Sequence, residues 1–390
     1  MRTLNRRMAV KSLVLGFVSL RTAKLSIAGA LLDKRREDQF GDWVEAEMTK
    51  TGVPGMAAAV VVGGETVFAK GYGSANAVTH DRVKTDTIFH LASVSKLVTG
   101  TTLMMLQERK RFQLDDPIAR FADFSVVHPK FPKERITFRH LLTHTSGISD
   151  GNYASSFTEP GDPKLSLRDF LTGYLSPGGR WYTSDGSFLD AAPGSRWSYS
   201  NVGMALAGYL VGRIGAISLD AFSRDEIFGP LGMNDTAWFL RDLKRPRNLA
   251  APHVPSRDGL CVIDPIGYPD WPAGLLRSSV TDLAQFLGVF ANQTIQGFRA
   301  SRIKVLPTTL AEMLERQPMP DSRYQALVWA GHLSGHKLRL GHAGGDPGAA
   351  TSVALDPDRR KGVIVLMNVS PSNGVNLFKE EAINRLFDLS

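Results

Sequence analysis

Cysteine is almost absent from this chain of 390 residues, in which Cys261 is the only one. A single cysteine excludes an intrachain disulfide scaffold, and it also excludes a cysteine-rich zinc or iron–sulfur site. Glycine and proline, with 37 and 21 residues, are too few for a collagen-like or low-complexity chain. With 43% hydrophobic residues, the composition is that of a globular protein with one large domain or two interleaved domains.

Several motifs that indicate a function are absent as well. The chain has no Walker or dinucleotide-binding glycine loop and no G-x-S-x-G of an α/β-hydrolase. His140 and His144 have the helical spacing of an H-E-x-x-H zinc site, but Leu141 stands where that motif has glutamate. We therefore assign these histidines a structural role, and we expect no metal and no cofactor.

Acidic residues are missing from the first 30 positions. The formal net charge is +8, and six of these positive charges lie in residues 1–30. The remaining chain is nearly neutral, so the basic balance does not indicate a nucleic-acid partner, and we expect none.

Residues 1–30 resemble a twin-arginine export signal. Arg6 and Arg7 precede an apolar run at 13–20, and Ala-Gly-Ala at 28–30 resembles a cleavage site. This run is far shorter than the roughly 20 residues that cross a bilayer, so we expect no stable membrane span. We predict a periplasmic or secreted protein, or a cytoplasmic one if the leader is not functional.

Strand patterns lie near both ends of the chain, with helix patterns between them. Runs at 56–62 and 66–71 are joined by Gly63-Gly64-Glu65, which favours a hairpin because glycine supplies the turn. Further strands are expected at 325–332, 337–341, 350–355 and 362–368, the last apolar enough to be buried on both faces. Helices are expected at 39–50, 97–109, 138–143, 202–214, 219–227, 281–291 and 373–389.

This order predicts an α/β (α+β) fold, in which one antiparallel sheet is built from both chain ends and flanked by helices. A mainly helical region is inserted between the strands. We divide the chain into the leader (1–30), a sheet subdomain (31–110 and 322–390) and a mainly helical subdomain (111–321). The two subdomains together form one domain, and its oligomeric state is not predicted.

Ser93-Val94-Ser95-Lys96 stands where a strand-like run meets a helix. Residues i and i+3 share a face in the first helical turn, so Lys96 is expected beside the Ser93 hydroxyl. The positive end of the helix dipole and partial burial disfavour a second cation there, so we expect Lys96 to act as a base on Ser93. The Ser93 backbone N–H can help to stabilise an oxyanion. The pattern is weak alone, because S-x-x-K also occurs at 301–304 and 334–337.

Tyr199-Ser200-Asn201 is the only Y-x-N in the chain, and it lies between a loop and a helix. A tyrosine near a lysine can take and return a proton, and Asn201 can bind a substrate amide or carbonyl and position Lys96. Viewed alone, Tyr199 is equally consistent with an amphipathic residue packed at a helix start.

His342-Ala343-Gly344-Gly345 is expected to end a strand. Small residues there, Gly344 among them, allow a substrate backbone to bind close to the strand edge. The Gly345 N–H is placed to be the second oxyanion donor. Viewed alone, His342 is equally consistent with a histidine that is hydrogen-bonded at a strand end.

The order S-x-x-K, Y-x-N and H-x-G resembles that of the serine β-lactamase and penicillin-binding-protein superfamily. The chain is most similar to the class C β-lactamase-related branch, which includes esterases and D-amino-acid peptidases. Segments at 71–76, 136–147 and 230–233 also resemble that branch, and the resemblance covers nearly all of residues 40–388.

The resemblance implies that Ser93 is the acylated nucleophile and that Lys96 and Tyr199 share the acid and base work. It implies that the N–H groups of Ser93 and Gly345 form the oxyanion hole and that His342 lines the strand-side wall. In true β-lactamases the third motif is K-T-G, and His342 stands where that motif has its lysine. A lysine is cationic at neutral pH, whereas a histidine is fully cationic only in acid solution. This weaker positive field argues against β-lactams as principal substrates.

We therefore expect a serine hydrolase that forms an acyl-enzyme on Ser93 and takes esters or D-amino-acid amides and peptides. Its partner is then a small molecule or a short peptide. A β-lactamase or DD-peptidase is an alternative, and so is an acyltransferase. A non-catalytic sensor that binds peptidoglycan fragments is an alternative of another class, disfavoured because Ser93, Lys96, Tyr199 and Asn201 are all retained.

Overall fold

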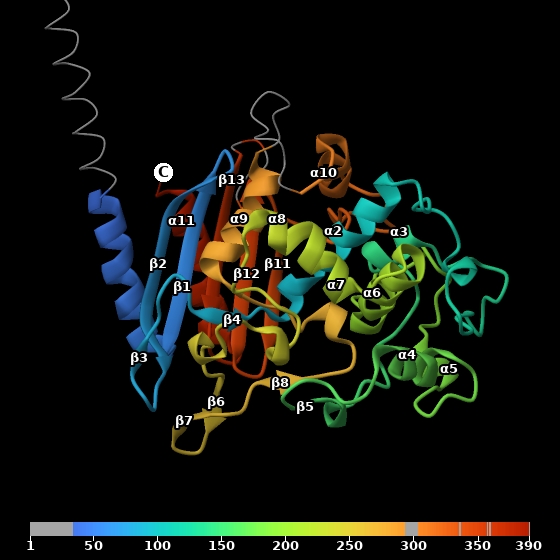
Figure 1. Ribbon diagram of the computed structural model, residues 1–390, viewed down its shortest axis with the longest axis horizontal. Helices are drawn as coiled ribbons and strands as arrows, with labels where there is room; N and C mark the ends of the chain where they lie inside the picture. Colours follow the sequence, from blue (N-terminus) through green and yellow to red (C-terminus); the bar gives the residue numbers. More distant parts are fainter. Residues whose placement is uncertain (1–33, 293–302, 335–336, 357, 359, 390) are drawn as a thin grey trace, which may run out of the picture.

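The computed structural model describes residues 34–292, 303–334, 337–356, 358 and 360–389, so the predicted leader lies outside the described residues. A seven-stranded antiparallel sheet forms one side of the molecule, and a mainly helical region forms the other (Figure 1). Its strands, in spatial order, are β10 (Ala330–Ser334), β11 (Lys337–Asp346), β12 (Ala349–Asp356), β13 (Lys361–Met367), β1 (Gly55–Val62), β2 (Glu65–Asn76) and β3 (Asp81–Arg82).

Strands from the two ends of the chain pair within this sheet. β1 and β13 are antiparallel neighbours, with Val60 opposite Val363. Gly63 and Gly64 connect β1 to β2 with φ angles of 58° and 94°, and a two-residue primed hairpin turn requires positive φ. The predicted hairpin and the predicted sheet built from both chain ends are confirmed.

Apolar side chains cover both faces of the central strands, because successive residues of a strand point to opposite sides. Met56, Ala58 and Val60 pack in one cluster with α11 (Asn373–Phe387) and the N-terminal helix, which is described over 34–51. The alternate residues of β1 belong to the larger cluster shared with the helical region. All seven residues of β13 are buried, as its apolar sequence predicted.

In the helical region α2 (Ser95–Glu108) packs against α6 (Asn201–Gly215), and α9 (Val280–Ala291) packs on β1 and β13. The other helices are α3 (Phe138–Leu142), α4 (Leu167–Leu175), α5 (Ser184–Ser187), α7 (Leu219–Ser223), α8 (Gly229–Leu231) and α10 (Pro307–Leu314). Short strands pair two by two: β4 (Ile88–His90) with β9 (Arg277–Ser279), β5 (Glu159–Pro160) with β8 (Ile266–Gly267), and β6 (His253–Ser256) with β7 (Gly259–Val262).

Several predicted boundaries are wrong, for example that of β2, which continues past 71 to Asn76. β10 begins at Ala330 rather than at 325, because the chain turns over 326–329 and Val328 has a φ of 62°. β11 continues past 341 to Asp346, since it stays paired with β12. α3 ends at Leu142, so His144 lies beyond the helix that was expected to carry it together with His140. The boundaries of the two subdomains stay a prediction.

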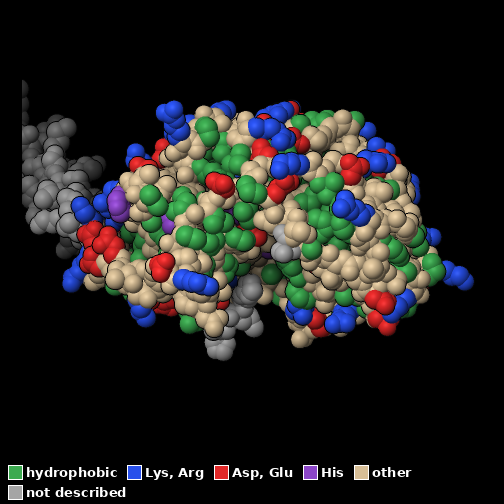
Figure 2. Space-filling model, turned by 90° about the horizontal axis from the view of Figure 1, so that it is seen from below, with side chains coloured by type: hydrophobic (Ala, Val, Ile, Leu, Met, Phe, Trp, Pro, Cys, Tyr) green, Lys and Arg blue, Asp and Glu red, His purple; other side chains and the backbone are tan. Residues whose placement is uncertain are grey.

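Within the described residues, no single helix combines the length and the hydropathy needed to cross a bilayer. One pair, Asn201–Gly215 and Leu219–Leu231, reaches that length only when both helices are taken together across a 78° bend. Figure 2 shows Lys and Arg side chains interspersed with Asp and Glu side chains over one face of the molecule. The absence of a nucleic-acid partner stays a prediction.

Candidate active site

Ser93 lies in a tight turn between β4 and α2. Ala92, directly before it, has a φ of 47°, which is uncommon for a residue with a Cβ and often marks a functional site. The turn Ala92–Val94 is a short 3-10 helix, so Ser93 precedes α2 rather than lying on its first turn as predicted. Within 91–106, Ser93 is the one residue that is not buried, so the turn exposes its side chain.

Lys96 is fully buried beside Ser93 and makes three hydrogen bonds. Its Nζ donates to Ser93 Oγ at 3.1 Å, to Asn201 Oδ1 at 2.8 Å and to the Ala273 carbonyl oxygen at 2.6 Å. The two carbonyl-type oxygens can only accept. When the amine is neutral they therefore hold its two hydrogens, and its lone pair is left to face Ser93. This arrangement allows Lys96 to take a proton from Ser93 without reorienting.

Asn201 is the first residue of α6, and Asp150 fixes its position. The Asp150 carboxylate accepts from the backbone N–H of Asn201 at 2.7 Å, from that of Val202 at 3.1 Å and from Ser200 Oγ at 3.0 Å. Ser200 Oγ in turn accepts from Gly203 N at 2.8 Å as the N-cap of α6. A carboxylate at the positive end of a helix is favourable, and this one orients the whole Y-x-N segment.

Tyr199 lies between Lys96 and the sheet. Lys96 Nζ is 4.8 Å from the centroid of the Tyr199 ring, and the His342 ring centroid is 6.2 Å from it. The His144 ring also contacts Tyr199, with 4.5 Å between the two ring centroids. His144 Nδ1 accepts a hydrogen bond from the backbone N–H of Ser200 at 3.2 Å. Burial, and then the charge of Lys96, lowers the pKa of His144 well below its usual value, so His144 is a neutral acceptor.

The edge of β11 next to this site is open. Only residues 337–341 of β11 pair with β10, whereas 342–346 pair with β12 alone among the described strands. His342 Nδ1 bonds the Ala343 carbonyl oxygen at 2.8 Å, so that carbonyl points to the open edge. Alternate residues of a strand direct their backbone groups to the same side, which places the Gly345 N–H on that edge too.

Because Gly344 has no side chain, β11 can pack closely against the turn that carries Ser93. A Cβ added to Gly344 would lie 2.4 Å from the Leu91 carbonyl oxygen and 2.3 Å from Thr351 Oγ1. Thr351 Oγ1 also donates to the Leu91 carbonyl oxygen at 2.7 Å. Gly344 is therefore needed for the close packing of β11 against the turn that carries Ser93.

Asp346, the last residue of β11, is held by two side chains. Tyr268 Oη donates to Asp346 Oδ2 at 2.8 Å, and His90 Nε2 lies 2.8 Å from the same oxygen. Burial raises the pKa of Tyr268 and lowers that of His90. These contacts fix the end of the strand next to Gly345.

Asp270 is a buried carboxyl whose pKa is influenced by the charge of Lys96. It precedes the turn Trp271–Ala273 whose last carbonyl bonds Lys96, and the Tyr153 hydroxyl donates to it. Burial raises the pKa of Asp270 to about 7, while the Tyr153 hydrogen bond and the charge of Lys96 oppose this rise. The protonation of Asp270 therefore influences the charge balance around Lys96.

The structure thus brings Ser93, Lys96, Tyr199, Asn201, His342, Gly344 and Gly345 to one place. Sequence reasoning missed Asp150, His144 and Asp270, which orient or surround them. Asp150 stands in a segment interpreted as a surface loop, and His144 was assigned only a structural role. No group of three or more His, Cys, Asp or Glu in the described ranges is arranged to hold a metal ion.

Comparison with known proteins assigns the chain to one class, the serine hydrolases related to β-lactamases and penicillin-binding proteins. The chain belongs to the Beta-lactamase family, whose model matches residues 40–386. This confirms the resemblance predicted from the three motifs.

Several curated relatives are similar over different lengths. Penicillin-binding protein 4* of Bacillus subtilis is 31% identical over 186 residues, which are 47% of this chain and 38% of the relative. The D-alanyl-D-alanine-carboxypeptidase/endopeptidase AmpH of Escherichia coli is 24% identical over 340 residues, 84% of either chain. Unguisins hydrolase ungD' of Aspergillus campestris is 24% identical over 86% of this chain, which spans 62% of that relative.

Solved structures share the fold. The octameric penicillin-binding protein homologue from Pyrococcus abyssi has a TM-score of 0.72 and 23% identity, and covers 90% of this chain and 77% of its own. D-alanine carboxypeptidase AmpC from Burkholderia cenocepacia has a TM-score of 0.68 and 20% identity, and covers 91% and 99%. The predicted α/β arrangement is thus confirmed.

Proposed function

We propose that this protein hydrolyses small esters or D-amino-acid amides and peptides through an acyl-enzyme on Ser93. The single observation that carries the proposal is the position of Lys96 Nζ. It lies 3.1 Å from the accessible Ser93 hydroxyl and donates hydrogen bonds to Asn201 Oδ1 and to the Ala273 carbonyl oxygen. This is the geometry of a nucleophile paired with its base.

The acylation step follows from these contacts. Ser93 Oγ attacks the carbonyl carbon of the substrate as its proton passes to the neutral amine of Lys96. The N–H groups of Ser93 and Gly345 hold the negative oxygen that forms. The bond from the carbonyl carbon to the leaving oxygen or nitrogen then breaks, and the leaving group takes the proton from Lys96 directly or through Tyr199.

Deacylation uses the same groups in reverse. Water attacks the acyl carbon, its proton passes to Lys96 or Tyr199, and the bond to Ser93 Oγ breaks. The proton then returns to Ser93 Oγ, so the acid is released and the serine is restored. An alcohol or amine in place of water would give acyl transfer, and product analysis with added alcohols or amines separates the two outcomes.

The substrate class rests on His342 and on the relatives. A histidine where true β-lactamases have lysine gives a weaker positive field at neutral pH, which favours substrates without an anionic anchor. The names of AmpH and of the Burkholderia structure include a D-alanine carboxypeptidase activity, which supports D-amino-acid peptides as candidates. A screen of p-nitrophenyl esters, D-amino-acid amides, D-Ala-D-Ala peptides and nitrocefin compares these substrates directly.

Labelling with a fluorophosphonate tests the nucleophile. We expect the wild type to be labelled at Ser93 and Ser93→Ala to be unlabelled. Ser334→Ala is the matched control, because Ser334 begins another S-x-x-K and should leave labelling unchanged. Undiminished labelling of Ser93→Ala would overturn the proposal, and a stable adduct without turnover would favour the sensor alternative.

We also propose that residues 1–30 direct export. The motif at Arg6 and Arg7 supports this proposal. N-terminal sequencing of protein from a bacterial periplasmic fraction should find a chain that begins near residue 31. Absence from that fraction, or an intact Met1, would contradict it.

A further inference from the structure

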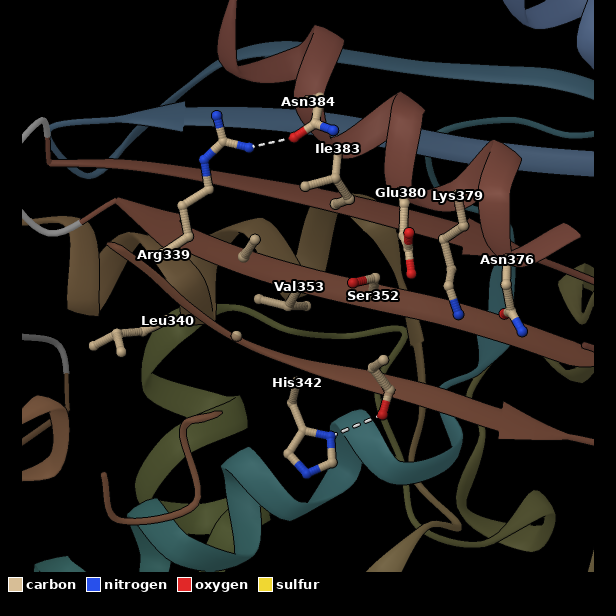
Figure 3. Close-up of a pocket in the computed structure, with 13 residues that line it drawn as sticks. Arg339, Leu340, His342, Ser352, Val353, Asn376, Lys379, Glu380, Ile383 and Asn384 are labelled. Carbon is tan, nitrogen blue, oxygen red and sulfur yellow. Dashed lines mark hydrogen bonds between the residues drawn. The ribbon is translucent and has the colours of Figure 1, made fainter. Parts of the chain in front are cut away.

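A cavity of about 550 Å³ lies between α11 and the strands β11 and β12. Figure 3 shows Lys379, Glu380 and Asn376 of α11 on one side of these strands and the His342 ring on the other. Leu91 and Val94, which flank Ser93, pack in the core cluster on the face of the sheet opposite to α11, so Ser93 lies across the sheet from this space. The volume is in the range of small-molecule sites in proteins.

Lys379 is the buried cation of this cavity. Its side chain points into the space in Figure 3, and the residue is only 6% exposed. Among the described residues, Lys379 Nζ has no hydrogen-bond or ion-pair partner. An ammonium group at the end of a buried stem is poorly hydrated, and an anion or another acceptor that reaches it through the cavity stabilises its charge. Burial lowers the pKa of Lys379, and the charge of Glu380 partly opposes this shift.

Lys361, another buried lysine beside α11, does have a hydrogen-bond acceptor for its amine. It is 3% exposed and on β13, and its Nζ donates to the Phe387 carbonyl oxygen at 2.7 Å. No such carbonyl is within reach of Lys379, whose amine faces the open space instead. This difference indicates that the Lys379 amine can bind an acceptor that belongs to a ligand rather than to the protein.

The other polar groups of the cavity favour a singly charged anion. Arg339 donates to Asn384 Oδ1 at 2.6 Å and stacks on the Phe387 ring, which holds its guanidinium in place. Asn376 and Ser352 supply neutral donors. Glu380 adds a negative charge at the exposed rim, which disfavours a doubly charged phosphate or sulfate.

We propose that this cavity binds a small carboxylate-bearing molecule, with Lys379 pairing the carboxylate and Arg339, Asn376 and Ser352 completing the site. The carboxylate can be the acid that the enzyme releases or a free amino acid, since both offer the same group. The proposal does not depend on catalysis at Ser93.

Isothermal titration calorimetry with N-acetylglycine as the probe tests this site. We expect the wild type to bind with a dissociation constant on the order of millimolar, as for a ligand of few atoms. Lys379→Met should weaken binding about tenfold or more, because one charged hydrogen bond is lost. Glu380→Gln is the matched control and should bind at least as tightly. N-acetylglycinamide and inorganic phosphate should bind weakly or not at all.

A second measurement uses the unaltered protein, in case Lys379→Met does not fold. Reductive methylation read by mass spectrometry should be slower at Lys379 with N-acetylglycine present and unchanged with N-acetylglycinamide. Lys50, whose side chain is 73% exposed, is the internal control. Equal binding by the wild type and a folded Lys379→Met, or no protection of Lys379, would overturn the proposal. Protection by a free D-amino acid, but not by an acid released from a substrate, would identify the amino acid as the source.

Discussion

The Asp150 carboxylate accepts a 2.7 Å hydrogen bond from the backbone N–H of Asn201, whose side chain accepts from Lys96. A loop residue thereby positions Lys96 through the start of α6. The substitution Asp150→Asn replaces one acceptor oxygen with a donor that faces backbone N–H groups. We expect a loss of about 1–3 kcal/mol of stability and a fall in kcat on the order of a hundredfold.

Ester turnover and urea unfolding measure these two effects. Asp185→Asn is a suitable control, because the Asp185 side chain is 80% exposed and should be neutral in both assays. An unchanged kcat in Asp150→Asn would show that Asn201 keeps its position without the carboxylate.

Gly344→Ala is expected to separate β11 from the turn that carries Ser93. The new Cβ would lie 2.4 Å from the Leu91 carbonyl oxygen, so one of the two backbones has to move. We expect a loss of about 1–3 kcal/mol in stability from overpacking and a large loss of fluorophosphonate labelling. Thermal melts and labelling kinetics measure both.

Gly212→Ala is the matched control for this substitution. The nearest atom to an added Cβ on Gly212 is 3.7 Å away, and the residue lies inside α6. Alanine is the better helix former, so we expect a gain of roughly 0.5–1 kcal/mol there with unchanged labelling. Equal effects at both positions would contradict the close packing of Gly344.

Asp270→Asn is expected to change how stability depends on pH. Burial raises the pKa of Asp270 to about 7, whereas an unfolded chain releases this proton near pH 4, at a pKa of about 3.9. Between these values the folded protein binds more protons than the unfolded chain, so stability falls as the pH rises from about 4 to about 7. The asparagine cannot titrate but can still accept from Tyr153, and it removes this fall.

The free energy of unfolding, measured from pH 4 to 8, is the readout. Relative to the wild type, Asp270→Asn should gain stability toward pH 8, by at most on the order of 4 kcal/mol for a three-unit shift. Two parallel pH curves would show that Asp270 is not responsible.

His342→Lys is expected to increase acylation by anionic β-lactams. A lysine there is charged at neutral pH, so nitrocefin should react faster by roughly tenfold, and the gain should shrink as salt rises. Turnover of a neutral p-nitrophenyl ester should not increase. Ala343→Lys places the same charge on the opposite face of the strand and is the control. An equal gain in both variants would assign the effect to overall charge rather than to the site.

Much of the fold and of the candidate site was predictable, because the signals are local. The apolar runs of β1 and β13 predicted strands, and Gly63-Gly64 predicted the turn. The order of Ser93, Tyr199 and His342 predicted residues that the structure does bring together. Their catalytic roles stay a proposal.

The remainder depends on contacts that a sequence pattern does not encode. Ala273 contributes a backbone carbonyl, which every residue type has, so no motif marks it. Asp150 stands among turn residues and becomes important only because its loop reaches α6. The end of β11 was missed because Gly344 and Gly345 lack strand propensity, and only pairing with β12 makes them a strand.

The pairing of β1 with β13 also has a consequence for the order in which the molecule matures. Residues 56–62 pair with residues 361–367, so the middle of the sheet cannot form until residue 367 has left the ribosome. Contacts so distant in sequence slow folding. Ser93 and Lys96 are made early, but the strand that completes their surroundings, β11, is made more than 200 residues later. A partly synthesised chain that lacks residues 337–367 therefore cannot assemble the proposed site.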